Sequence, residues 1–121
     1  MKTVTDKRPW GHFERFTLNE VSTVKLIHVN AGKRLSLQYH TKRSEFWKVI
    51  SGKIKVTLDG SSAVLSEGET ITIPMRSAHR IEAIKDSIIL EISVGEFDEE
   101  DIIRLQDDYN RATEPPTVQK E

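Results

Sequence analysis

Residues 32–52 read GKRLSLQYHTKRSEFWKVISG, and this stretch decides how the rest of the chain is interpreted. From Leu35 to Tyr39, apolar and polar side chains alternate as in a half-buried β-strand. The polar face of that strand carries Gln38 and His40, and Glu45 follows after a short turn. Burying a polar group costs free energy unless a partner satisfies it. An inward row of such groups therefore indicates a functional site.

Short runs that alternate or are rich in β-branched residues continue on both sides of this stretch. Turn signals separate them at the spacing typical of a β-sandwich or barrel. These signals are Asn30 to Gly32, Ser51-Gly52, Asp59-Gly60 and Glu67-Gly68. We therefore predict an all-β body.

Residues 98–112, DEEDIIRLQDDYNRA, form an exception. Asp98 can cap a first turn that is rich in acid, and Ile102, Leu105 and Tyr109 recur at helical spacing. This pattern predicts one short helical segment near the C-terminus.

The composition limits the class of protein. With 121 residues the chain can bury one modest core, so we expect a single domain over residues 1–111 and a flexible tail over the proline-containing residues 112–121. A net charge of -1 argues against binding nucleic acid, and no apolar run approaches a membrane span or a signal peptide. We expect a cytoplasmic protein without disulfides or thiolate ligands, since cysteine is absent.

A hairpin would bring Gln38, His40 and Glu45 together, because the first two share a strand face and the third opens the next strand. His79 begins a later strand and is a fourth candidate. Two imidazoles, a carboxylate and an amide oxygen suit one divalent ion, Zn²⁺ first, with Mn²⁺, Fe²⁺, Co²⁺ or Ni²⁺ as alternatives.

The spacing of these residues resembles the two motifs of the cupin family. The first motif runs from Gly32 through Gln38, His40 and Glu45 to Gly52, with glutamine in place of the usual first histidine. The second runs from Gly68 through Pro74 to His79, with Arg76 in place of the usual glycine. The resemblance implies a double-stranded β-helical (jelly-roll) barrel in which the four polar positions converge on one metal.

Within cupins, residues 8–111 resemble the isomerase domain of type II mannose-6-phosphate isomerases, which usually follows a mannose-1-phosphate guanylyltransferase domain. The stretches that carry this likeness are RPWGHFERF, LSLQ with RSE, IPMRSAHRIE and EEDIIRLQDDYNR. The resemblance implies metal-dependent interconversion of mannose 6-phosphate and fructose 6-phosphate. Two positions depart from it: Phe46 stands where the family has histidine, and Ala83 where it has asparagine.

The resemblance also suggests roles for charged residues. Arg43 matches an arginine implicated in isomerisation, and Glu82 and Glu91 match glutamates that could act as the base. Glu91 faces away from its apolar neighbours, and this position favours a solvent-facing strand carboxylate over a base. Cations that could hold the substrate phosphate, or be ordinary surface charges, are Arg34, Lys48, Arg80, Arg104 and Arg76, of which Arg80 should alternate outward.

Two other classes of function stay open, because function lives in the site and not in the fold. One is a non-catalytic cupin that binds a sugar or metabolite, and the other is a different metal-dependent cupin enzyme such as an oxygenase. Gln38, Arg43 and the DDYNR ending favour the isomerase. Small cupins commonly pair, and apolar residues on both strand faces lead us to expect a homodimer whose small-molecule partner is a sugar phosphate.

Overall fold

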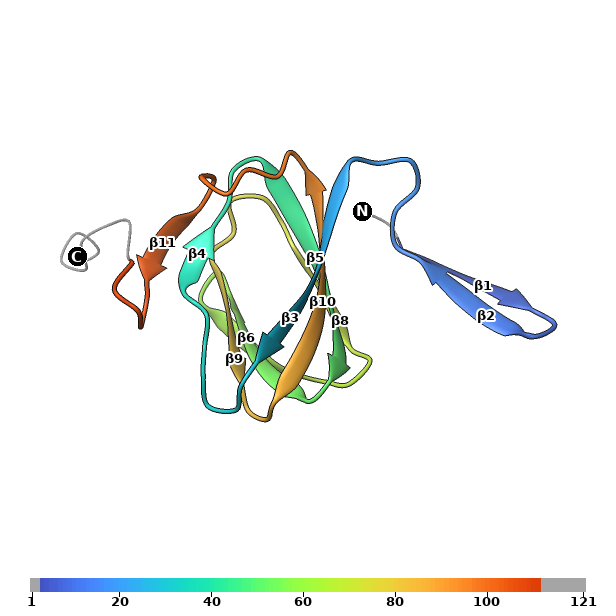
Figure 1. The fold of residues 1–121 in the computed structure, drawn as a ribbon, viewed down its shortest axis with the longest axis horizontal. Helices are drawn as coiled ribbons and strands as arrows, with labels where there is room; N and C mark the ends of the chain where they lie inside the picture. Colours follow the sequence, from blue (N-terminus) through green and yellow to red (C-terminus); the bar gives the residue numbers. More distant parts are fainter. Residues whose placement is uncertain (1–2, 112–121) are drawn as a thin grey trace.

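The computed structural model describes residues 3–111, and every regular element in that range is a β-strand (Figure 1). The strands are β1 (Val4–Arg8), β2 (Gly11–Arg15), β3 (Ser22–Val29), β4 (Leu37–Tyr39), β5 (Arg43–Ser51), β6 (Lys53–Leu58), β7 (Ser61–Ser66), β8 (Thr70–Ile73), β9 (His79–Ala83), β10 (Ser87–Gly95) and β11 (Ile103–Gln106). The prediction of an all-β body is confirmed.

Two antiparallel sheets form the body, which Figure 1 shows as two walls around a common interior. The four-stranded sheet has the order β3-β10-β5-β8, and the five-stranded sheet has the order β11-β4-β9-β6-β7. Side chains from both sheets meet in one buried cluster: Val29, Trp47, Val49, Ile54, Val56, Ile73, Ile81, Ala83 and Ile89. The core therefore fills one part of the space between the sheets and leaves the rest for polar side chains.

Glycines close the turns between strands where the sequence predicted them. Asp59 and Gly60 both have positive φ, which suits the two-residue turn of the β6–β7 hairpin. Gly52, at φ +91°, joins β5 to β6, and a Cβ there would collide with Ser87 and with the Asp86 carbonyl oxygen. The glycine that ends the first motif is thus required by close packing against the start of β10.

The β1–β2 hairpin projects from the body at the right of Figure 1. Phe16 and Glu14 anchor its base, by ring contact with Phe46 (centroids 5.6 Å apart) and by an ion pair with Lys48 (2.9 Å). Trp10 at its tip is 72% exposed.

The predicted C-terminal helix is wrong for the described residues. Asp98 does cap a turn, accepting from the Glu100 amide, but the chain then becomes extended and forms β11. This strand pairs with β4, with Ile103 opposite Tyr39 and Arg104 opposite Gln38. The free edge of β4 offers backbone hydrogen bonds that a helix would forgo, so tertiary pairing overrides the local helical pattern. No helix that could span a membrane occurs in residues 3–111, and the predicted tail lies outside them.

Candidate metal centre

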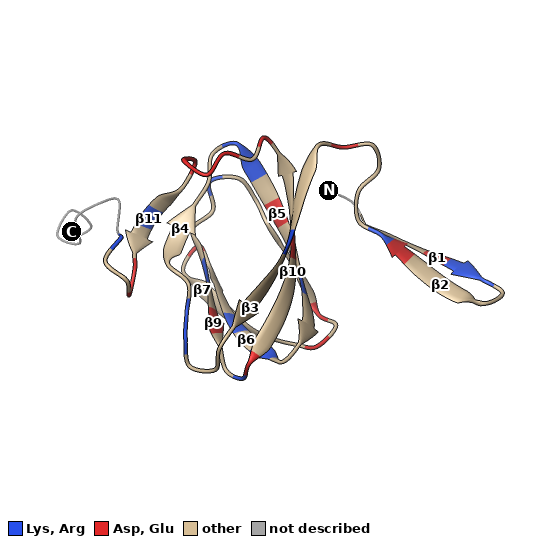
Figure 2. Ribbon diagram, viewed as in Figure 1, with Lys and Arg blue, Asp and Glu red and all other residues tan. Residues whose placement is uncertain are grey.

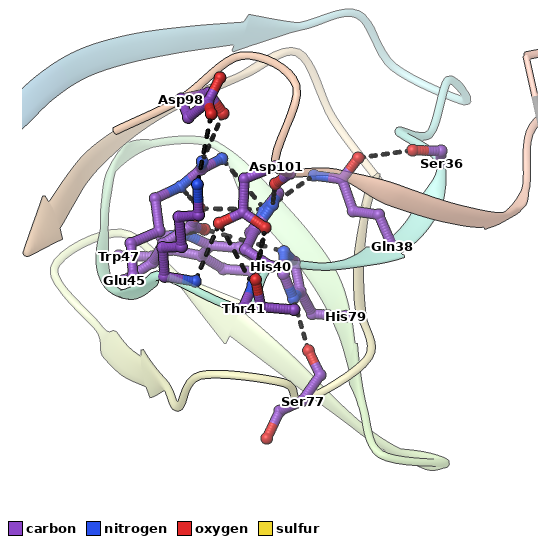
Figure 3. A network of polar contacts seen from close by, with 12 residues as sticks. Ser36, Gln38, His40, Thr41, Glu45, Trp47, Ser77, His79, Asp98 and Asp101 are labelled. Carbon is purple, nitrogen blue, oxygen red and sulfur yellow. Dashed lines mark hydrogen bonds and ion pairs between the residues drawn. The ribbon is translucent and has the colours of Figure 1, made fainter. Parts of the chain in front are cut away.

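Three buried side chains converge between the two sheets (Figure 3). His40 follows β4, Glu45 lies on β5 and His79 opens β9. One nitrogen of each histidine and one oxygen of Glu45 lie within 4.8 Å of one another, and each residue is at most 3% exposed. The two histidines come from neighbouring strands, because β4 pairs with β9 through the register pair Gln38 and His79, whereas β5 brings Glu45 from the other sheet.

Backbone carbonyls orient both imidazoles. His40 Nδ1 donates to the Asp101 carbonyl oxygen at 2.7 Å, and His79 Nδ1 donates to the Ser77 carbonyl oxygen at 2.8 Å. In the neutral rings, each Nε2 therefore keeps its lone pair and faces Glu45, the tautomer in which histidine binds metals.

His79 is held neutral and without a partner at its second nitrogen. Burial lowers the pKa of His79, and the negative charge of Glu45 only partly opposes this. Its Nε2 is buried and has no hydrogen-bond partner among the described residues. A buried polar atom left without a partner is destabilising, and a metal ion would satisfy it.

Glu45 supplies the negative charge. Burial alone would raise the pKa of Glu45, but the contacts of its carboxylate with His40, His79 and the Trp47 indole outweigh burial and lower that pKa to about 2. Trp47 Nε1 donates to Oε1 at 3.0 Å, and Arg43 Nε donates to Oε2 at 3.3 Å. One carboxylate with two imidazoles is a donor set that fits Zn²⁺ and similar ions, so the residues present fit the implied metal.

Gln38 lies beside this trio with its amide nitrogen nearest. Its Nε2 is 3.4 Å from His40 Nε2, and its Oε1 accepts from the Ser36 hydroxyl at 2.6 Å. Rotating the amide by half a turn would direct Oε1 toward the trio, and the Ser36 hydroxyl could then accept from Nε2. Gln38 is therefore in position to be a fourth ligand.

Asp101 holds the turn between His40 and Arg43. Its carboxylate accepts from the Thr41 amide, the Thr41 hydroxyl and the Lys42 amide, each at 2.9 Å, while its carbonyl orients His40. Burial would raise the pKa of Asp101, but these hydrogen bonds outweigh it and lower the pKa. Sequence reasoning missed this residue, because its partners lie 59 to 61 positions away.

A cavity of about 230 Å³ opens beside the trio. It is lined by Gln38, Arg43, Glu45, Glu91 and Arg104, together with Lys25, Ile27, Leu35, Phe97, Glu99 and Ile102. The cavity therefore borders Gln38 and Glu45 of the candidate ligand set together with several charged groups.

Glu91 faces this cavity and is only 7% exposed, so the solvent-facing alternative is wrong. Ile88, Leu90 and Ile92 occupy the outer face of β10, and Ile89 and Ser93 share the inner face with Glu91. Burial, followed by the nearby charge of Glu45 and a hydrogen bond with it, raises the pKa of Glu91 to about 8.

Other residues singled out from the sequence lie away from the cavity. Arg34 forms a two-bond ion pair with Asp108 (2.7 and 2.8 Å), and Lys48 pairs with Glu14. Glu82 lies between the buried Ile81 and Ala83 on β9 and so occupies the opposite face of the strand.

Arg80 also points away from His79, as expected, yet it is buried, because β11 covers it. Its guanidinium donates to the Leu35 carbonyl (2.9 Å) and to both oxygens of Gln106 (3.2 and 3.4 Å). Arg76 is exposed in the turn before His79, and its amide donates to the His40 carbonyl oxygen at 2.7 Å. Of the five predicted phosphate cations, the structure brings Arg104 to the cavity.

The chain matches the family "Mannose-6-phosphate isomerase C-terminal" over residues 2–107. The chain belongs to this family. It is 41% identical over 112 residues to the alginate biosynthesis protein AlgA of Pseudomonas aeruginosa, covering 89% of this chain and 23% of that protein. It is 36% identical over 107 residues to a mannose-1-phosphate guanylyltransferase of Escherichia coli K12, covering 86% of this chain and 22% of that protein. The chain thus spans less than a quarter of the length of these relatives.

Solved structures with the same fold support the cupin architecture of this mannose-6-phosphate isomerase C-terminal domain. KdgF from a Halomonas species superposes with a TM-score of 0.62 at 20% identity, covering 65% of this chain and 73% of that one. An oxalate decarboxylase mutant of Bacillus subtilis gives 0.63 at 24% identity, covering 72% of this chain and 25% of that one. At such identities the likeness concerns the fold alone.

Lys25 and Phe97 are two cavity residues of this isomerase-family domain that sequence reasoning missed. Lys25 shares strand parity with the partly buried Ile27 and the buried Val29, which is the signal that could have placed it inward. Phe97 follows β10 in an irregular segment, where no periodicity indicates the direction of a side chain.

Proposed function

We propose that this chain is a metal-dependent isomerase that interconverts mannose 6-phosphate and fructose 6-phosphate. The observation that carries the proposal is the buried trio of His40, Glu45 and His79 beside a charged cavity, in a chain that matches the isomerase C-terminal family over residues 2–107. The volume of the cavity, about 230 Å³, lies below the ~300–1,000 Å³ typical of drug-sized ligands, which favours a monosaccharide derivative over a nucleotide sugar.

His40, Glu45 and His79 would hold the metal, and Gln38 would complete the set. We propose Zn²⁺ as the ion, with Mn²⁺, Fe²⁺, Co²⁺ and Ni²⁺ as alternatives, because all accept imidazole and carboxylate ligands. Bound there, the ion would act as a Lewis acid that polarises the carbonyl oxygen of the sugar.

In the aldose-to-ketose direction the reaction moves one proton from C2 to C1 of the sugar and a hydroxyl proton from O2 to O1, and Glu91 is the carboxyl group best situated to carry the first. Glu91 lines the cavity on the same wall as Glu45. In the aldose-to-ketose direction, Glu91 would take the proton from C2 and return it to C1, so that no proton is gained or lost overall. Because burial raises its pKa, ionised Glu91 is a stronger base than an ordinary carboxylate.

Arg43 would stabilise the negative charge that develops on oxygen as the proton leaves carbon. Its guanidinium contacts both Glu45 and His40 Nε2, the latter at 3.2 Å, and it also donates to the Asp98 carbonyl at 3.4 Å. A fixed cation directed at the point where charge appears stabilises the transition state more than the bound sugar. Glu82 lies on the opposite face of β9, away from the cavity, and is therefore the weaker candidate for the base.

A coupled assay tests this proposal. Protein freed of metal with a chelator is reloaded with each of the five ions and supplied with mannose 6-phosphate, and fructose 6-phosphate is detected with linked enzymes. We expect turnover with at least one ion and none in the presence of chelator. A protein that binds metal and mannose 6-phosphate but never turns over would instead be a binding cupin.

A further inference from the structure

At the centre of strand β3, apolar side chains point outward and a charged side chain points inward. Val24 and Leu26 point outward and are 61% and 58% exposed, whereas the lysine between them lies among the cavity residues. Figure 2 shows basic positions (blue) on strands of both sheets, among them β5 in one sheet and β11 in the other. An inward lysine flanked by outward aliphatic residues reverses the arrangement that solvation favours, so the inward ammonium needs an explanation.

Structural pairing does not supply that explanation. The Lys25 ammonium forms no hydrogen bond and no ion pair within 4.0 Å in the part of the chain that the structure describes, residues 3–111. Glu91 stands opposite Lys25 in the β3–β10 register, and the charge of Lys25 acts to lower the pKa of Glu91, but the two side chains are not in ion-pair contact. By contrast, Lys48 and Arg34 have carboxylate partners at 2.9 Å and 2.7 Å.

The neighbours of Lys25 leave its ammonium directed at the cavity. Its Nζ lies 4.4 Å from the centre of the Phe97 ring, and the Arg43 guanidinium lies 4.4 Å from the same ring. This double contact holds both cations by cation–π attraction without neutralising either one. Arg104, opposite Gln38 in the β4–β11 register, lines the same cavity from the other sheet.

We propose that Lys25, steadied by Phe97 and assisted by Arg104, is the residue that binds the phosphate of a phosphorylated hexose in this cavity. This proposal rests on the proposed function for the identity of the sugar. In this arrangement Arg43 stabilises the charge that develops near the trio during the reaction, and Lys25 binds the phosphate at the other end of the substrate. Of the residues that sequence reasoning chose for this task, Arg34, Lys48 and Arg80 are engaged elsewhere.

A different role would give a different result. If Lys25 served only to offset the charge of Glu91, replacing it would disturb proton transfer and lower kcat while leaving discrimination between phosphorylated and plain sugar intact. If it binds phosphate, the loss falls on affinity for the phosphorylated sugar and on KM. The comparison of mannose 6-phosphate with mannose separates these two roles.

The experiment measures equilibrium binding of mannose 6-phosphate and of mannose, by NMR titration, to wild type, Lys25→Met, Lys25→Arg and the control Lys55→Met. Lys55 is an exposed lysine on β6, outside the cavity. We expect Lys25→Met to weaken binding of mannose 6-phosphate by roughly tenfold or more and to leave that of mannose unchanged. Lys25→Arg should restore part of the loss, Lys55→Met should match wild type, and thermal unfolding verifies that each variant is folded.

Unchanged affinity of Lys25→Met for mannose 6-phosphate would overturn the inference, as would an equal loss for both sugars or a wild type that binds no phosphorylated hexose. The proposed function fails separately. A wild type that binds mannose 6-phosphate through Lys25 but does not convert it would refute the isomerase and support the phosphate site. A wild type that converts it with Lys25→Met unaffected would do the reverse.

Discussion

Asp101 connects the C-terminal segment to the metal centre, and its removal should damage both stability and metal binding. Asp101→Ala deletes three hydrogen bonds from Thr41 and Lys42, each at 2.9 Å, and leaves the backbone carbonyl that orients His40 in a looser segment. A hydrogen bond to a charged group contributes about 1.5–3 kcal/mol when buried, but Thr41 and Lys42 are exposed and water can replace the lost acceptor.

Taking about 1 kcal/mol for each of the three bonds, we expect Asp101→Ala to lower the free energy of unfolding by about 3 kcal/mol. With an unfolding entropy of about 2.1 cal/mol/K per residue over this chain, that corresponds to a fall in Tm of roughly 10–15 °C. Asp101→Asn keeps one acceptor oxygen and should lose about half as much.

The assay is thermal unfolding of chelator-treated protein, followed by metal titration of each variant at a temperature where all are folded. Asp108→Ala is the control, since Asp108 is an exposed carboxylate whose partner is Arg34, and it should change neither result appreciably. The pKa of Asp101 is lower folded than unfolded, so its contribution is present above the unfolded pKa of about 4 and is lost as the pH falls through the folded value. A Tm difference of under 3 °C at pH 7, or one that persists undiminished at the lowest pH that keeps the fold, would refute this reasoning.

Further predictions follow from the same geometry. Arg43→Ala should leave metal content unchanged yet reduce isomerisation by roughly 10²-fold, with poor rescue by lysine, and an equally active variant would remove Arg43 from the chemistry. Glu91→Gln should reduce kcat by roughly 10²-fold or more whereas Glu82→Gln should have little effect; the opposite order would exchange their roles. Because Val24, Leu26 and the tip residue Trp10 are exposed, we expect a homodimer, and light scattering at the mass of one chain would contradict it.

Sequence reasoning succeeded where the relevant information was local. Alternation and turn glycines predicted the strands around Gly52 and Gly60, and motif spacing identified His40, Glu45 and His79, which the structure brings together. Both kinds of signal extend over a few tens of residues at most, within which strand periodicity is reliable.

Sequence reasoning failed where the inner face of a strand had to be distinguished from its outer face. On β3 and β10, the outward positions are apolar too, as Val24, Leu26 and Ile88 show, so alternation alone did not reveal that the face carrying Lys25 or Glu91 is the inner one. The helix prediction failed for a related reason. The sequence of residues 98–112 contains no sign that β4 has a free edge with which this segment can pair as strand β11.

The most direct test of the central claim follows mannose 6-phosphate by NMR in D₂O with metal-loaded wild type, chelator-treated wild type and the metal-loaded His79→Ala variant. The account predicts that fructose 6-phosphate forms only with the metal-loaded wild type, and that metal analysis shows about one equivalent of ion in that protein and far less in the variant. Equal conversion by chelated protein or by His79→Ala would contradict it, and so would a wild type that takes up no ion and converts no sugar with Zn²⁺, Mn²⁺, Fe²⁺, Co²⁺ or Ni²⁺.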